Sequence, residues 1–460
     1  MSLKQILKCR DDAGPVSFDL QNASSSSGPE FVLVDGQSCS WAKAGESFGP
    51  ERLRPRIEPW LTALCQAEHM SLLVGSGLTH AVNHLGGCGA LPGMGSADFG
   101  DFHEEIDVEA KRSAKRAGRR EGNIEDQVRV ANELLRGLQI LGASARSRAL
   151  AKRLERVLRG FAGSILDGER QLALAKGVDR EKAFTYLVSF LMSFASRSGT
   201  RDRLHIFTTN YDRLIEAGAE VAGLHLLDRF VGSLAPIFRS SRLDLDVHYN
   251  PPGIRGEPRY LEGVARFTKL HGSLDWLDVQ GSIRRFGVPF GARSIGPYLD
   301  TPGSGLAGAA SLMIYPNAVK DRETAAYPYV ELFRDFAAAA CRPNNTLVTF
   351  GYSFGDEHIN RVLEDMLTIP STHLVVISFG DPLERIMATY KKLGRSAQIS
   401  LLIGSHVGAL SSLVDHYLPK PAIDRTTFRM AELLKARWST VQRDIDRAGV
   451  PAPDDPGTLP

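Results

Sequence analysis

Three short polar motifs constrain this chain most, because each directly follows an apolar run typical of a buried β-strand. The motifs occupy residues 208–212 (TTNYD), 270–273 (LHGS) and 351–356 (GYSFGD). Parallel strands that are buried on both faces read as short apolar runs, and open α/β sheets bind ligands where those strands end. The sequence therefore predicts an α/β fold with a Rossmann-like parallel sheet and a nucleotide site at its carboxyl edge.

A fourth segment lies upstream, where the apolar residues 71–74 (SLLV) precede residues 75–79 (GSGLT). This order predicts a strand, a glycine turn and the start of a helix. Backbone N–H groups at such a turn can bind a diphosphate. A purely structural turn uses the same residues, and His80 replaces the third glycine of the dinucleotide fingerprint, so this segment alone leaves both interpretations open.

The four segments, in this order, resemble the sirtuin-like NAD-binding family. The closest resemblance is to the bacterial branch whose members hydrolyse NAD in anti-phage defence, depleting it in abortive infection. The segments span residues 71 to about 380, and their combination is far more specific than any one of them. The resemblance implies that NAD⁺ is the substrate and that the products are nicotinamide and ADP-ribose.

The resemblance also implies roles for individual residues. Asn210 and His271 would be catalytic, with Asp212 as a nearby acidic partner. The pyrophosphate would be held by Gly75, Ser76, Gly77 and Thr79. The adenosine end would be lined by Gly351, Ser353 and Asp356, and from the next strand by Ser378.

These residue types suit cleavage of the nicotinamide–ribose bond. That reaction expels a neutral leaving group and leaves an oxocarbenium-like sugar, so it needs positioning more than acid assistance. An Asn amide can accept from and donate to a water or a ribose hydroxyl, and a His can accept a proton from either. A nearby carboxylate favours the developing positive charge.

Each residue also has a structural explanation. Asn210 could close a strand through an Asx-turn, and Asp212 could cap the helix expected from residue 213. His271 could be a buried histidine bonded to the backbone, and Ser353 or Asp356 could cap a helix at residues 357–360. We favour function for Asn210 and His271, leave Asp212 open, and expect capping to be the larger role of Asp356.

The cysteines separate this chain from protein-deacylating sirtuins, which carry a four-cysteine zinc module. The five cysteines here are scattered and contain no C-x-x-C pair, so we expect no zinc, no other metal and no disulfide framework. A cluster of His80, His84 and Cys88 could share a helix face, but Gly86 and Gly87 break that helix. Deacylation is therefore the less favoured activity. We expect NAD hydrolysis, with ADP-ribosyl transfer as an alternative that the sequence leaves open. A non-catalytic NAD-sensing scaffold is the alternative from another class.

Three regions are expected along the chain. Residues 1–50 form a β-rich arm, residues 51–420 the catalytic domain, and residues 421–460 a C-terminal helix and a disordered tail. A helical insertion occupies about residues 101–200, because residues 124–141 and 146–166 carry apolar positions at helical spacing. The glycine-rich residues 86–100 are expected to form a mobile lid over the site.

Charge and hydropathy bear on location and partners. The formal net charge is +2, and the basic residues 111–120 lack interleaved aromatic side chains, so contact with nucleic acid is conceivable but not predicted. The longest apolar stretch falls short of a bilayer span and no signal peptide is evident, so a cytoplasmic location without membrane contact is expected. The resemblance suggests a homo-oligomer paired with a HerA-like ATPase.

Overall fold

The structure is a computed structural model that describes most of the 460 residues. The described residues are 4–9, 12–22, 28–91, 93–116, 122–197, 201–241, 243, 245–249, 259–261, 263–299, 312 and 327–420. The C-terminal helix and tail expected at residues 421–460 lie outside them.

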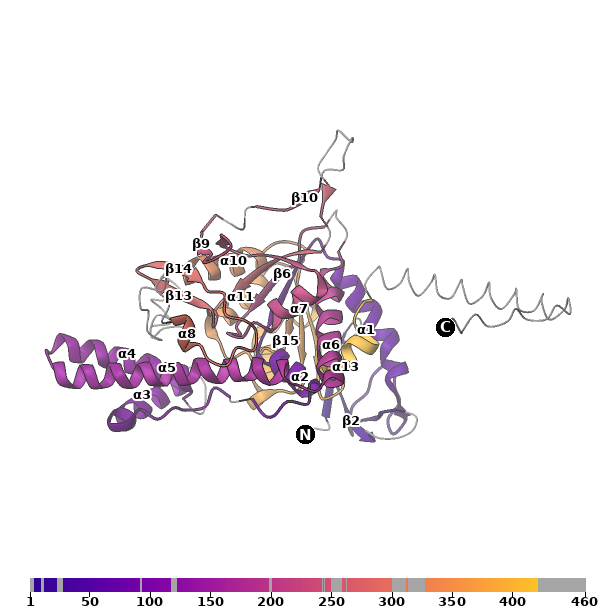
Figure 1. Ribbon diagram of the computed structural model, residues 1–460. Helices are drawn as coiled ribbons and strands as arrows, with labels where there is room; N and C mark the ends of the chain where they lie inside the picture. Colours follow the sequence, from indigo (N-terminus) through magenta and orange to yellow (C-terminus); the bar gives the residue numbers. More distant parts are fainter. Residues whose placement is uncertain are drawn as a thin grey trace, which may run out of the picture. The chain divides into compact units, whose positions relative to one another are not determined.

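A large mixed sheet forms the centre of residues 4–418 (Figure 1). Its strands lie in the order β4-β3-β2-β1-β17-β16-β15-β5-β6-β12-β7, and the seven from β17 to β7 are parallel. The parallel strands are β17 (Ile399–Ile403), β16 (His373–Ser378), β15 (Asn345–Phe350), β5 (His69–Val74), β6 (His205–Thr208), β12 (Val264–Lys269) and β7 (His225–Leu227). This architecture confirms the predicted α/β class with a Rossmann-like sheet.

The N-terminal residues extend this sheet by antiparallel pairing, since β1 pairs with β17 and β2 to β4 follow it outward. These strands are β1 (Lys4–Lys8), β2 (Val16–Asn22), β3 (Glu30–Leu33) and β4 (Ser47–Phe48). Phe18 and Phe31 are fully buried, with their ring centroids 5.4 Å apart. The β-rich segment therefore shares its core with the main sheet.

Helices cover both faces of the sheet because the strands are apolar on both sides. One apolar core joins the sheet to α1 (Pro50–Cys65), α2 (Ser76–Leu85), α6 (Gly177–Ala195) and α7 (Leu214–Ala222). A second core on the other face includes α10 (Tyr329–Ala340), α11 (Glu357–Met366) and α12 (Arg385–Leu393). Every residue of β15 is buried, as expected of a central parallel strand.

The order in which the chain adds strands to the sheet reverses between β5 and β15. After β5 the chain continues to β6 on one side, and after β15 it continues to β16 on the other. Such a switch point opens a crevice at the carboxyl ends of the two strands, where ligands of α/β sheets bind.

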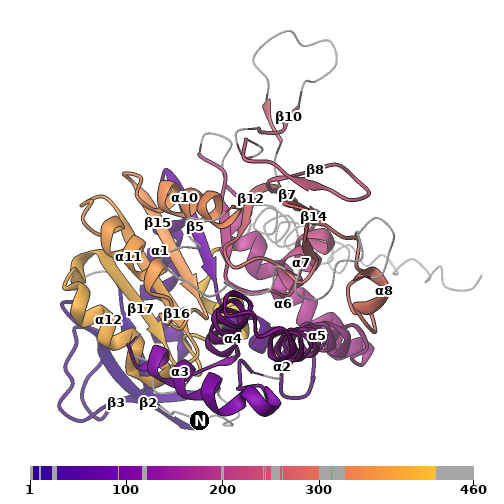
Figure 2. The same ribbon diagram turned by 90° about the vertical axis from the view of Figure 1, so that its left-hand side faces the viewer.

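The helical insertion, whose helices α3, α4 and α5 are labelled in Figure 2, packs in a third apolar core that also takes in Tyr211 and residues from 274–312. It contains α3 (His103–Arg116), α4 (Ile124–Ile140) and α5 (Ser144–Ala173), preceded by the short η1 (Gly100–Phe102). The expected stripe on the second predicted helix is buried at Leu150, Leu154 and Leu158. The last helix of the region, α6, instead packs in the main core.

Short elements complete the described chain. A four-stranded sheet contains β8 (Phe230–Val231), β9 (Ile237–Phe238), β14 (Ser282–Arg285) and β13 (Trp276–Val279), and a two-stranded sheet contains β10 (His248–Tyr249) and β11 (Arg259–Tyr260). The remaining helical turns are α8 (Gly296–Leu299), η5 (Pro382–Glu384), η6 (Ser396–Gln398), α13 (Leu410–Ser412) and η7 (Leu413–Tyr417). None of the helices in the described ranges is long and apolar enough to cross a membrane.

Three histidines held in this fold make its stability depend on pH. Burial lowers the pKa of His205 to about 3 and the pKa values of His373 and His406 to about 4. Each is neutral in the folded chain, whereas in the unfolded chain each takes up a proton below about pH 6.5. Stability is therefore full above about pH 6.5 and is lost as the pH falls toward 4.

We predict that His373→Gln weakens this acid sensitivity. Glutamine can replace the 2.8 Å hydrogen bond between His373 Nε2 and Ser400 Oγ, but it takes up no proton. The measurement is the unfolding midpoint between pH 8 and pH 5, with His225→Gln at an exposed position as the control. An unchanged slope in His373→Gln would contradict the assignment.

Candidate functional site

Two adjoining cavities lie at the carboxyl edge of the parallel sheet. The first, here named the Asn210 cavity, has a volume of about 380 Å³. The second, named the Ser378 cavity, has a volume of about 840 Å³ and shares Ser76, His80 and Ser353 with the first. The site residues expected from the sequence divide between them. The Asn210 cavity is lined by Gly75, Ser76, Thr79, Asn210, Asp212, His271, Gly351, Ser353 and Asp356, and Gly77 and Ser378 line the Ser378 cavity.

A chain of hydrogen bonds orients the Asn210 side chain. Asn210 Nδ2 donates to the Gly75 carbonyl oxygen at 3.0 Å and to Thr79 Oγ1 at 3.1 Å. Thr79 Oγ1 in turn donates to Asp212 Oδ2 at 2.7 Å. Both amide hydrogens of Asn210 are thereby used, so its amide oxygen is the group left to accept a hydrogen bond from a ligand.

The two carboxylate oxygens of Asp212 accept hydrogen bonds from different parts of the chain. Its Oδ2 fixes Thr79, while its Oδ1 accepts from the Leu214 N–H at 3.1 Å in the first turn of α7. The side chain therefore combines the helix-start contact with a link to Asn210.

His271, which follows β12, and Asp356, the N-cap residue of α11, meet at the Asn210 cavity. His271 Nε2 lies 3.0 Å from Asp356 Oδ2, while Asp356 Oδ1 accepts from the N–H groups of His358 and Ile359 at 2.8 and 3.3 Å. The carboxylate caps α11, as expected, and it also orients the imidazole. An ionised carboxylate can only accept, so Nε2 donates this hydrogen bond and the orientation of the ring is fixed by it.

Two glycine turns meet at the switch point with almost no space between their backbones. Gly75 N–H donates to Phe350 O at 2.9 Å, and Gly77 N–H donates to Gly351 O at 3.1 Å. A Cβ atom on Gly77 would lie 2.5 Å from Gly351 Cα, and Gly351 has a φ of +62°. Only glycine fits this arrangement at both positions.

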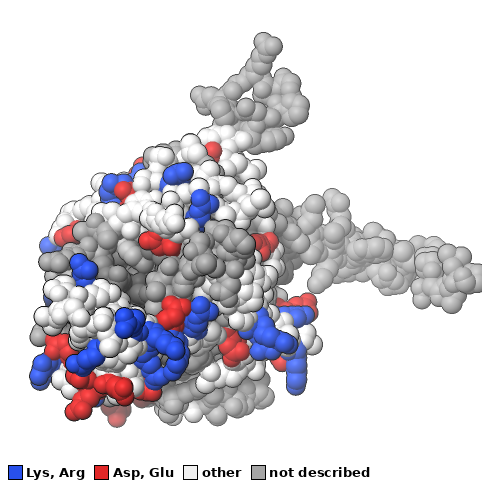
Figure 3. Space-filling model, turned by 60° about the vertical axis from the view of Figure 1, so that its left-hand side comes forward, with Lys and Arg blue, Asp and Glu red and all other residues white. Residues whose placement is uncertain are grey.

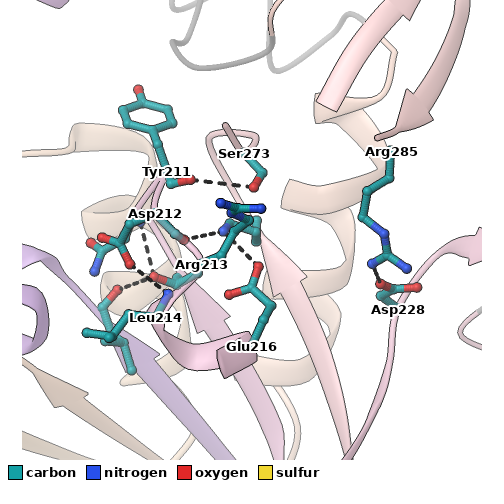
Figure 4. Close-up of polar contacts among 12 residues, drawn as sticks. Tyr211, Asp212, Arg213, Leu214, Glu216, Asp228, Ser273 and Arg285 are labelled. Carbon is teal, nitrogen blue, oxygen red and sulfur yellow. Dashed lines mark hydrogen bonds and ion pairs between the residues drawn. The ribbon is translucent and has the colours of Figure 1, made fainter. Parts of the chain in front are cut away.

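The loop that carries Asn210 is also held from behind. Lys269 is buried and donates to the Asp212 backbone oxygen and, at 2.9 Å, to Glu216 Oε1. Figure 4 shows Asp212 and Glu216 on this loop and helix, with the Tyr211 backbone oxygen 3.5 Å from Ser273 Oγ. The loop geometry therefore depends on the ends of β6 and β12 together.

Sequence patterns did not identify four polar residues that line the cavity or support it. Glu125 and Glu169 come from the insertion, Arg213 follows Asp212, and Arg385 begins α12. The Asn210 cavity is lined by four carboxylates, from Glu125, Glu169, Asp212 and Asp356. Arg385 is the one Lys or Arg among its lining residues within the described chain.

The described part of the basic run belongs to α3, and its first two residues are paired with acidic side chains. Lys111 lies 2.7 Å from Asp107, and Arg112 lies 3.1 Å from Glu109. Figure 3 shows positive and negative side chains intermingled over the lower part of one face. This pairing is typical of a solvated helix; residues 117–120 of the run lie outside the described chain.

The described ranges contain no group of three or more His, Cys, Asp or Glu side chains arranged to hold a metal ion. His80, His84 and Cys88 line the Ser378 cavity, and α2 ends at Leu85. Residues of the expected lid segment lie at both cavities: Leu91 and Met94 line the Asn210 cavity, and Leu91 also lines the Ser378 cavity.

We predict that Gly77→Ala destabilises the protein by about 1–3 kcal/mol, because the added methyl group forces the two glycine turns apart. Gly137→Ala in α4 is the matched control, since a Cβ atom there meets no other atom within 4 Å. Chemical denaturation measures both variants. Equal stability of Gly77→Ala and the wild type would show that the close approach of the turns is not required.

Part of the chain matches a known protein family. Residues 204–396, from just before β6 through η6, match the family model described as a SIR2-like domain. No curated protein matches the chain. The family match, together with the α/β fold, supports a sirtuin-like family and is consistent with NAD-related activity.

Proposed function

We propose that this protein cleaves NAD⁺ at the nicotinamide–ribose bond, with water as the acceptor, to give nicotinamide and ADP-ribose. The observation that carries the proposal is the chain of hydrogen bonds from Asp212 through Thr79 to Asn210. It leaves the Asn210 amide oxygen to accept from a water or a ribose hydroxyl, in the same cavity as His271.

The charge of the Asn210 cavity suits this chemistry. Bond cleavage concentrates positive charge on the ribose as neutral nicotinamide departs. Four carboxylates line the cavity and favour such a charge. His271, oriented by Asp356, can accept the proton that an attacking water or hydroxyl loses.

The two phosphates of NAD⁺ require positive or hydrogen-bond-donating groups instead. A pyrophosphate is dianionic, so donors must offset the repulsion from the carboxylates that line the cavity. Ser76, the first residue of α2, supplies a backbone N–H and a hydroxyl, and Arg385 supplies a guanidinium. The Ser378 cavity, which adjoins these groups, would then hold the adenosine.

We predict that Asn210→Ala and His271→Ala each lower nicotinamide release at least 100-fold, the scale expected for a positioned acid–base or orienting group. Both side chains reach the cavity from strand ends, so the far-UV circular dichroism and melting temperature should stay near the wild-type values. Nicotinamide release is measured by chromatography. Substantial turnover in both variants would refute the catalytic assignment.

We predict that Arg385→Ala raises the KM for NAD⁺ about 10–100-fold with a smaller change in kcat, as expected for loss of a charged hydrogen bond to phosphate. Arg385→Lys should recover part of the loss because it keeps the charge. Lys392→Ala is the matched control, on the same helix with its side chain 71% exposed. A fall in kcat at unchanged KM would contradict a phosphate-binding role.

The biological setting is proposed on the family resemblance. An active NAD hydrolase would harm its own cell, so the proposal includes restraint by assembly, as a homo-oligomer that pairs with a HerA-like ATPase during anti-phage defence. ADP-ribosyl transfer differs from hydrolysis only in the acceptor. It would appear as label from NAD retained on a protein.

A further inference from the structure

Side chains in the catalytic loop alternate between two sets of partners. Asn210 and Asp212 bond to the glycine turn and Thr79. Tyr211 and Arg213, the residues between and after them, bond instead to the helical insertion. The insertion therefore contacts the same loop that holds the catalytic amide.

Tyr211 is the first point of contact. Its hydroxyl donates to Glu125 Oε1 at 2.6 Å, and Glu125 lies in the first turn of α4. The Tyr211 ring packs edge-on against Phe161 of α5, with ring centroids 5.9 Å apart. Tyr211 thus packs in the same apolar core as the insertion, and it also lines the Asn210 cavity between Asn210 and Asp212.

Arg213 is the second point of contact. Glu169 of α5 accepts from the Arg213 backbone N–H at 2.8 Å and from its guanidinium at Nε and Nη2. The two side chains are 8% and 2% exposed, so the ion pair is shielded from water and salt. Arg213 also donates to the backbone oxygens of Val288 and Pro289.

These contacts fix the backbone on both sides of Asp212. Its neighbours Tyr211 and Arg213 are bonded to α4 and α5, which pack together in one apolar core. A shift of these two helices would therefore move the loop with them. Asn210 would then lose its hydrogen bonds to Gly75 and Thr79, which orient its amide.

We propose that the helical insertion positions the catalytic loop through Glu125 and Glu169, so that displacement of α4 and α5 lowers turnover while the dinucleotide still binds. The predicted loss of turnover rests on the proposed function, whereas the positioning of the loop does not. Glu125, Glu169 and Tyr211 act as positioning residues through Asn210.

The first test compares Tyr211→Phe and Glu125→Ala with the double variant. Tyr211→Phe removes the hydroxyl and keeps the packed ring. We expect each single variant to lower kcat at least 10-fold with KM for NAD⁺ within 3-fold, and the double variant to be no worse than either one. Glu125→Gln, which keeps an acceptor for the hydroxyl but removes one of the cavity carboxylates, should recover part of the activity that Glu125→Ala loses.

Glu155→Gln is the matched control for charge, because Glu155 lies on α5 and pairs with Arg159 on the surface. It should leave kcat unchanged, whereas Glu169→Gln should lower it. Additive losses in the double variant, or wild-type kcat in Tyr211→Phe, would overturn the proposal. A lower melting temperature with unchanged kcat would also overturn it, since that is the result of a merely structural contact.

A second readout does not depend on catalysis. Amide hydrogen exchange of residues 205–215 should quicken in Glu125→Ala, while exchange in β17 stays at the wild-type rate. If the wild type consumes no NAD⁺, the proposed function fails, and this exchange measurement still decides the positioning role. Unchanged exchange in residues 205–215 would overturn the proposal even if the protein hydrolyses NAD⁺.

Discussion

The close contact between the glycine turns after β5 and β15 is the constraint on which the rest of the site depends. It brings Gly77 and Gly351 together at the switch point, with no room for a side chain on either. Because of this approach, the Gly75 carbonyl oxygen lies where Asn210 can donate to it. The crevice, the helix start that faces it and the orientation of the Asn210 amide all follow from one backbone contact.

Around that contact the cavity is lined mainly by negative side chains. Glu125, Glu169, Asp212 and Asp356 line the Asn210 cavity, and Arg385 is the one Lys or Arg among its lining residues within the described chain. Several of the carboxylates are already committed: Asp356 to His271, Asp212 to Thr79 and Glu169 to Arg213. The side chains of the site are therefore already oriented by contacts within the protein, which is the arrangement that the proposed cleavage requires.

The fold could be predicted from the sequence because its signals are local. The apolar residues 374–377 and 399–403 fall in β16 and β17, and the helical spacing of residues 146–166 falls in α5. The strand-end motifs also placed Asn210 and His271 at one edge, since parallel strands end together.

The contacts that order the site could not be predicted in this way. Tyr211 and Glu125 are 86 positions apart, His271 and Asp356 are 85 apart, and Arg213 and Glu169 are 44 apart. No spacing rule links such pairs, because they depend on how the insertion and α11 pack. Asp356 shows the difference. Its role as the N-cap of α11 could be predicted from the adjacent sequence, whereas its hydrogen bond to His271 could not.

The most direct test of the account is to follow the purified protein's reaction with NAD⁺ in ¹⁸O-labelled water by mass spectrometry. The account predicts nicotinamide and ADP-ribose in equal amounts, with one ¹⁸O atom in each ADP-ribose. Intact NAD⁺ that remains bound would contradict the proposed cleavage, and ADP-ribose attached to protein would contradict water as the acceptor.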